Sequence, residues 1–194
     1  MEDPFFLAPF DTDKFRTGII EEYKTILRPL VHQPVTLLEI GVFKGGSMMY
    51  WDSYLKHQGS RIVGIDLSVP RLEVSDRVFL HVCDQNDREG LLPIARTYQQ
   101  FDLIIDDGSH RRRETQTCFE ALYPFLKAGG YYVIEDWAVG YYEKSFPQFE
   151  GMIKMITDLM EQYWDWGFES YRIVREPGKA IAFFQKGTGK HPES

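Results

Sequence analysis

The stretch VTLLEIGVFKGGSMMYWDSYLKH, residues 35–57, decides the fold of this chain. Residues 35–42 are mostly apolar, rich in branched side chains and interrupted by a glycine near their end, which predicts a buried β-strand. Residues 46–57, after the paired glycines, predict a helix. A strand that leads into a helix is typical of sheets whose parallel strands are joined by helical crossovers. The stretch therefore favours an α/β fold.

The remainder of the chain repeats this alternation. Apolar strands are predicted at residues 61–68, 78–84, 101–106 and 131–136, and helices at residues 14–27, 88–100, 111–130 and 146–163. Residues 170–176 and 180–187 flank a Pro-Gly-Lys turn, which predicts a closing hairpin. We expect a mostly parallel sheet with helices on both faces, to which only the hairpin adds an antiparallel strand.

The composition is that of an ordinary soluble globular protein. The chain has 194 residues, of which 43% are hydrophobic and 26% are charged, so one domain with a sizeable core is expected. A net charge of -7 argues against a nucleic-acid partner, which would require a basic face. Two cysteines give neither a disulfide framework nor a zinc spacing, which favours a cytoplasmic location. We expect no signal peptide and no membrane partner.

Acidic residues recur at the ends of all five predicted parallel strands. They are Glu39, Asp66, Asp84, the pair Asp106 and Asp107, and the pair Glu135 and Asp136. Ligands of open α/β sheets bind outside the carboxyl ends of the strands. One such acid is commonly a helix cap, but five strand ends together indicate a binding site along this edge of the sheet.

The loop after the first strand indicates a nucleoside ligand that lacks a pyrophosphate. Its spacing from Gly41 to Gly45 is G-x-x-x-G, which is neither the G-x-G-x-x-G of dinucleotide sites nor a P-loop. Glycine still allows a ligand to approach closely, and the helix that begins near Ser47 attracts a carboxylate. Asp66 follows Gly46 by 20 residues and can accept both hydroxyls of a ribose. A plain strand–helix turn and a helix cap are the alternative interpretations.

Five motifs resemble those of class I S-adenosylmethionine-dependent methyltransferases. They are LLEIGVFKGGS, IVGIDLS, HVCDQND, DDGSH and GGYYVIEDW. The last two make the chain similar to a branch, often metal-dependent, that includes macrolide-sugar O-methyltransferases and cephalosporin-hydroxylase-like proteins. The resemblance covers Thr12 to Gly187 and implies a Rossmann-like fold with a seven-stranded, mostly parallel sheet. Residues 1–194 would form a single domain, with a lid or helix segment at residues 1–30 and a frayed tail at residues 188–194.

The resemblance also implies the cofactor contacts. The methionine part of S-adenosylmethionine would lie against Glu39, Gly41, Gly45 and Ser47, the ribose against Asp66, and the adenine against Asp84 and Gln85, with Asp106 close to the cofactor. Relatives often have histidine and tyrosine soon after a T-D-K sequence. This chain instead has Phe15 and Arg16 there, with Tyr23 later, which leaves the acceptor undefined.

The stretch FDLIIDDGSH, residues 101–110, predicts a metal site together with the acids after the fifth strand. Asp106 or Asp107, Glu135 and Asp136 supply the hard oxygen ligands that suit Mg²⁺. By resemblance the ligands map onto Asp106, Glu135 and Asp136, with Asp107 in reserve. A bound metal would orient an acceptor hydroxyl and lower its pKa.

His110 follows these aspartates closely. Histidine titrates near neutrality, and we therefore predict that His110 accepts the hydroxyl proton as a general base. Asp106, which would act through the metal, is the second predicted catalytic residue. The alternative is that His110 only begins the following helix.

Three further features have more than one interpretation each. The basic run at residues 111–113 either meets an acidic substrate or forms a solvated helix face. Trp137, Tyr141 and Tyr142 either form an aromatic wall for a sugar or pack against the next helix. The aromatic segment at residues 4–10 would dock on the body, on a neighbouring subunit of a homo-oligomer, or as a lid.

These observations together predict an enzyme of natural product biosynthesis. It would be a Mg²⁺-dependent O-methyltransferase that acts on a hydroxyl of a small molecule such as a sugar. An NAD-type oxidoreductase is the first alternative, and the missing dinucleotide fingerprint disfavours it. A non-catalytic domain that binds the cofactor or a partner is the second, and the complete carboxylate set disfavours it.

Overall fold

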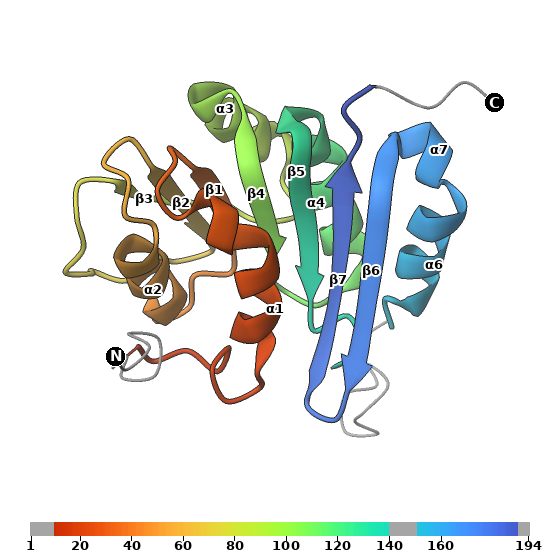
Figure 1. Ribbon diagram of the computed structural model, residues 1–194, viewed down its shortest axis with the longest axis horizontal. Helices are drawn as coiled ribbons and strands as arrows, with labels where there is room; N and C mark the ends of the chain where they lie inside the picture. Colours follow the sequence, from red (N-terminus) through yellow and green to blue (C-terminus); the bar gives the residue numbers. More distant parts are fainter. Residues whose placement is uncertain (1–9, 140–150, 190–194) are drawn as a thin grey trace.

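The computed structural model describes residues 10–139 and 151–189, which form one seven-stranded sheet (Figure 1). The strands are β1 (Thr36–Ile40), β2 (Arg61–Asp66), β3 (Val78–Val82), β4 (Phe101–Asp106), β5 (Leu126–Glu135), β6 (Phe168–Glu176) and β7 (Lys179–Lys186). Their order is β3-β2-β1-β4-β5-β7-β6. Strands β1 to β5 pair in parallel, and β7 pairs antiparallel with both β5 and β6. The predicted sheet and its closing hairpin are confirmed.

Helices cover both faces of the sheet, as the strand composition predicts (Figure 1). They are α1 (Ile19–Leu27), α2 (Gly46–Tyr54), α3 (Arg88–Tyr98), α4 (Arg112–Leu122), α6 (Ile153–Glu161) and the short α7 (Tyr163–Trp166), with 3₁₀ turns η1 (Arg28–Leu30) and η2 (Tyr123–Phe125). Successive strand residues point to opposite faces. Leu37 therefore packs in the core under α1 and α2, whereas Leu38 packs in the core under α3, α4 and α6.

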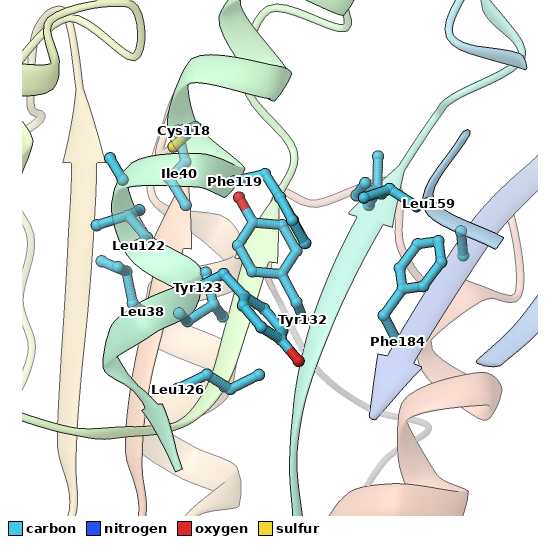
Figure 2. Packing of buried hydrophobic residues seen from close by; sticks show 14 of the residues in the cluster. Leu38, Ile40, Cys118, Phe119, Leu122, Tyr123, Leu126, Tyr132, Leu159 and Phe184 are labelled. Carbon is cyan, nitrogen blue, oxygen red and sulfur yellow. The ribbon is translucent and has the colours of Figure 1, made fainter. Parts of the chain in front are cut away.

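Aromatic side chains fill the core beneath α4 (Figure 2). The ring of Phe119 lies 5.0 Å from that of Tyr123 and 4.8 Å from that of Tyr132 on β5. Tyr132 thus connects this core to the end of β4, since its hydroxyl group reaches the Asp106 carboxylate. Packing of this kind fixes the strand ends from which the site is built.

Helix α4 is shorter than its apolar pattern predicts. The prediction ran to Gly129 and Gly130, but the helix ends at Leu122 and β5 already begins at Leu126. Pro124 is the physical reason, because it has no N–H group with which to continue the helical hydrogen bonds, and the chain passes instead into the 3₁₀ turn η2 at Tyr123. The two glycines instead lie inside a β5 that is longer than predicted.

Two other helix predictions are too long at their amino ends. Helix α1 begins at Ile19, not at Lys14, because Gly18 adopts a left-handed conformation with φ 74° before it. Lys14 therefore lies in a turn before the helix. Helix α6 begins at Ile153, whereas the prediction began at residue 146, which lies outside the described residues.

The sheet order places a crevice beside β1. The chain leaves β1 for β2 on one side, while β4 is its neighbour on the other. Loops that leave in opposite directions open a crevice at the carboxyl ends of such strands, and ligands of this fold class bind there. Among residues 10–139 and 151–189, the structure has no helix with the length and apolarity to cross a membrane.

Candidate active site

A cavity of about 620 Å³ lies at the carboxyl ends of the parallel strands. This size falls within the usual range for small-molecule sites. Its lining comes from the loops after β1 to β5 and from the segment before α1. The predicted site residues along it are Gly41, Ser47, Asp66, Asp84, Gln85, Asp107, His110 and Asp136. The structure therefore brings residues from five separate sequence motifs to one cavity.

Gly41 lets two of these loops approach each other. Its φ is 94°, and a Cβ atom at this position would lie 2.1 Å from the main-chain oxygen of Asp107. Any larger residue would push the loop after β4 away from the loop after β1. Gly45 faces the Leu72 side chain and is not part of the cavity lining.

Asp66 lies on the cavity wall at the end of β2. Its Oδ2 atom accepts a hydrogen bond of 2.8 Å from the main-chain N–H of Phe43. The carboxylate thereby shapes the loop after β1 and faces the same cavity. Asp84 also lines the cavity, and its Oδ1 atom accepts the N–H of Asn86 at 2.8 Å.

The Gln85 amide connects two loops of the site. Its Nε2 atom donates to Asp106 Oδ1 at 2.6 Å, and its Oε1 atom accepts the N–H of Ser109 at 2.9 Å. Both ends of the amide are therefore engaged in holding the loop that carries His110. The predicted contact between Gln85 and an adenine stays a prediction.

The Asp106 carboxylate lies away from the cavity. It is 2% exposed, is bonded to Gln85, and lies 3.4 Å from the hydroxyl group of Tyr132. Burial raises the pKa of Asp106 to about 7. The strand's alternation turns this side chain towards α4 and that of Asp107 towards the cavity, so the geometry favours Asp107 over Asp106 as the metal ligand, and the assignment stays a prediction.

We expect Asp106→Asn to stabilise the protein at neutral pH. Folding raises the pKa of Asp106, so the folded state keeps this proton up to a higher pH than the unfolded state does. The stability that the protonated acid contributes is therefore lost as the pH rises from 3.8 towards 7. The amide carries no charge, and the variant should gain up to about 4 kcal/mol over the native protein between pH 4 and pH 8. Denaturant unfolding at both pH values measures this gain. An equal difference in the free energy of unfolding between the variant and the native protein at pH 4 and pH 8 would contradict this prediction.

A buried lysine occupies the centre of the carboxylate cluster. The Nζ atom of Lys14 lies 2.6 Å from Asp107 Oδ2, 2.6 Å from Glu135 Oε1 and 3.3 Å from Glu39 Oε1. The hydroxyl group of Tyr23 also donates to Glu135 Oε1 at 2.6 Å. Burial lowers the pKa of Lys14, but the charges of Asp107 and Glu135 outweigh it and raise this pKa well above its usual value.

One ammonium group cannot neutralise three carboxylates. Burial and the charge of Asp107 accordingly raise the pKa of Glu135, despite the opposing effect of Lys14. Burial also raises the pKa of Glu39, although the indole N–H of Trp51 donates a hydrogen bond of 2.7 Å to its carboxylate. The cluster therefore contains more carboxylate groups than the single ammonium group of Lys14 can neutralise.

Asp107, His110 and Asp136 form a second group beside this lysine. Each offers one ligand atom, and these three atoms lie within 4.8 Å of one another. Burial and the charge of Asp107 raise the pKa of Asp136. His110 and Asp136 adopt left-handed backbone conformations, with φ 54° and 50°. Strained residues of this kind cluster at functional sites.

Comparisons with known proteins agree with this geometry. Residues 38–137, more than half of the chain, match the family described as "Methyltransferase domain". The chain belongs to this methyltransferase family. The match spans β1 to the end of β5 and so includes most of the cavity lining.

The relatives include proteins named as O-methyltransferases. Mycinamicin VI 2''-O-methyltransferase of Micromonospora griseorubida is 39% identical over 128 residues, which are 62% of this chain and 31% of that protein. Demethylmacrocin O-methyltransferase of Streptomyces fradiae is 33% identical over 155 residues, which are 72% of this chain and 39% of that protein. The chain thus spans about a third of the length of these relatives.

A solved structure has the same fold. It is the MycE methyltransferase in complex with Mg, S-adenosylhomocysteine (SAH) and mycinamycin VI, with a TM-score of 0.72 and 28% sequence identity. The match covers 93% of this chain and 56% of that one. The predicted Rossmann-like methyltransferase fold is confirmed.

The methyltransferase domain uses its predicted acids in three different ways. Asp107 and Asp136 lie together with His110, so the reserve aspartate replaces Asp106 in the cluster. Glu135 is held by Lys14 and Tyr23, and Glu39 lies behind the cavity lining against Trp51. The order of the acids along the chain could not distinguish these uses.

Lys14 and Tyr23 contact the carboxylate cluster, and the sequence did not lead us to expect either of them there. A signal was available, because several acids buried at one edge require a cation nearby, and Lys14 belongs to the T-D-K sequence. The late Tyr23 reaches the cluster from α1. Phe15 instead packs on Tyr50, with ring centroids 5.1 Å apart.

The aromatic residues that the sequence suggested for the site contribute less to it than the acids do. Trp137 is 8% exposed and packs in the core, which supports its interpretation as a packing residue. Tyr141 and Tyr142 lie outside the described residues. Of the segment at residues 4–10, only Phe10 is described, and its ring lies 5.8 Å from that of Tyr50.

Proposed function

We propose that this protein transfers a methyl group from S-adenosylmethionine to a hydroxyl oxygen of a small molecule, with Mg²⁺ bound at the site. One observation carries the proposal. A single cavity is lined both by Asp66, a carboxylate of the kind that binds a ribose, and by the cluster of Asp107, His110 and Asp136. A nucleoside cofactor and an acceptor hydroxyl group require these two chemistries side by side.

The cluster fits a hard divalent cation. Asp107 and Asp136 present carboxylate oxygens to the same point, and such oxygens are the ligands that Mg²⁺ prefers. Burial and the charge of Asp107 raise the pKa of Asp136, although His110 and Lys14 oppose this, so a cation bound between the two acids would stabilise their charged forms. Asp107 and Asp136 would hold the ion, which when bound lowers the pKa of a coordinated hydroxyl group.

The chain's own residues would then perform three tasks. Asp66 and the loop after β1 hold the cofactor, which supplies the methyl group as a sulfonium. The walls of the cavity align the acceptor oxygen, and alignment provides much of the rate of such a displacement. His110 accepts the proton that the hydroxyl group releases.

The acceptor class rests on the relatives. The curated relatives are named as O-methyltransferases of macrolides or of sugar-bearing tetracenomycins. A hydroxyl group of a sugar attached to a natural product is therefore the acceptor that we propose. Because the chain spans only part of each relative, the substrate must be tested directly.

Calorimetric titration tests the proposal. The protein should bind S-adenosylmethionine and SAH saturably, and NAD should give no heat. We expect Asp66→Ala to weaken SAH binding about 10- to 100-fold, since a hydrogen bond to a charged group contributes roughly 1.5–3 kcal/mol. Asp165→Ala, an exposed acid on α7, serves as the control and should leave the affinity unchanged.

The other outcomes identify the alternative functions. Binding of NAD without either adenosyl ligand would replace the methyltransferase proposal with an oxidoreductase. Binding of SAH without turnover of any glycosylated acceptor, in the presence of Mg²⁺, would favour a non-catalytic cofactor-binding domain.

A further inference from the structure

The segment before α1 forms one wall of the cavity. Asp11, Thr12 and Asp13 line it together with the loops that follow the strands. Lys14 comes next in the chain and is 1% exposed. Its side chain enters the carboxylate cluster and contacts residues from β1, β5 and the loop after β4. The lysine thus connects the wall to Asp107, which also lines the cavity, and to two buried carboxylates behind the lining.

A second contact seats the same segment independently. A Cβ atom on Gly46 would lie 2.2 Å from the main-chain oxygen of Asp11. The backbone of the segment therefore rests directly on the first residue of α2. This glycine does not require a left-handed conformation, since its φ is not among the positive values. Its missing side chain is needed for the segment to come this close.

We propose that Lys14 is a positioning residue, which holds residues 11–13 as a wall of the cavity through its contacts with Asp107 and Glu135. The inference rests on the proposed function for the identity of the ligand. It adds that the cofactor binds tightly only when this ammonium group is seated. Lys14 acts through the wall and through the two carboxylates, and has no contact with the reacting atoms.

The charges explain why the anchor is strong. Two buried carboxylates, Glu39 and Glu135, and the partly buried Asp107 surround one ammonium group, so withdrawal of the lysine would leave like charges packed together without a cation. Breaking a buried pair by removing one partner is strongly destabilising. The segment therefore gains much more from docking than a surface salt bridge would provide. A fixed wall also spares the ligand the entropic cost of ordering it.

Lys14→Met tests the anchor, because methionine keeps much of the length of lysine and removes the charge. We expect SAH to bind at least tenfold more weakly, and chymotrypsin to cleave faster within residues 10–18. Lys127→Met is the matched control. Lys127 binds Asp102 at 2.7 Å at the opposite ends of β4 and β5, so this variant loses a more exposed ion pair far from the cavity and should keep the native affinity.

Gly46→Ala provides the second test, because it displaces the segment while Lys14 and the carboxylates remain. This variant should also weaken SAH binding and speed cleavage. If Lys14→Met does not fold, Gly46→Ala alone tests whether the seated segment is needed for tight binding. Native SAH affinity in a folded Lys14→Met, or in Gly46→Ala, would overturn the positioning role. Failure of the native protein to bind SAH would instead overturn the proposed function.

Discussion

Asp107→Asn is expected to abolish the binding of Mg²⁺ and to reduce kcat/KM at least about a hundredfold. A cation that stabilises charge on a reacting oxygen contributes several kcal/mol, and about 1.4 kcal/mol corresponds to a factor of ten. Asp107 is one of the two carboxylates whose oxygens meet at the cluster. The amide keeps the size of the side chain and removes its charge, so the change isolates the electrostatic contribution.

One companion variant separates the loss of cation binding from the loss of the contact between Asp107 and Lys14. Asp107 also binds Lys14, whereas none of the hydrogen bonds and ion pairs of Lys14 involves Asp136. Asp136→Asn should therefore abolish Mg²⁺ binding in the same way. A loss confined to Asp107→Asn would assign the effect to the anchor.

Asp106→Asn distinguishes between the adjacent aspartates. Its carboxylate is buried against Gln85 and Tyr132, so this variant should bind Mg²⁺ with native affinity. Titration of the three variants with Mg²⁺ compares them on one scale. Loss of binding in Asp106→Asn, with native binding in Asp107→Asn, would restore the assignment that the sequence favoured.

The sheet could be predicted from sequence because its signals are local. Residues 101–106 form an apolar run, and the structure has a strand with these bounds. The same pattern misled at residues 123–130, where apolar spacing suited a helix but Pro124 ended it. The periodicity of apolar residues indicates which residues are buried. Where a helix or strand ends depends instead on the backbone conformations that single residues, such as proline, can adopt.

The composition of the site was predictable in part. Five acidic strand ends indicated the correct edge of the sheet, because topology alone brings those ends together. Which of two adjacent acids faces the cavity depends on the exact residue at which the strand ends, and that point is set by tertiary packing. The partner of Glu135 lies 121 residues away in Lys14, so no local pattern announces it.

His110→Asn should reduce kcat about 10²- to 10⁴-fold, which is the usual contribution of a positioned proton acceptor. Asparagine suits the test because it tolerates the left-handed backbone that His110 adopts, with φ 54°, and its amide cannot take up the proton. Mg²⁺ prefers oxygen ligands, so Asp107 and Asp136 should retain it and His110 should remain available as the base. Turnover and Mg²⁺ titration on the same preparation decide between the two roles of this residue. A fall in cation affinity that accounts for the lost rate would make His110 a ligand, whereas lost kcat with native affinities for Mg²⁺ and SAH identifies it as the group that accepts the proton.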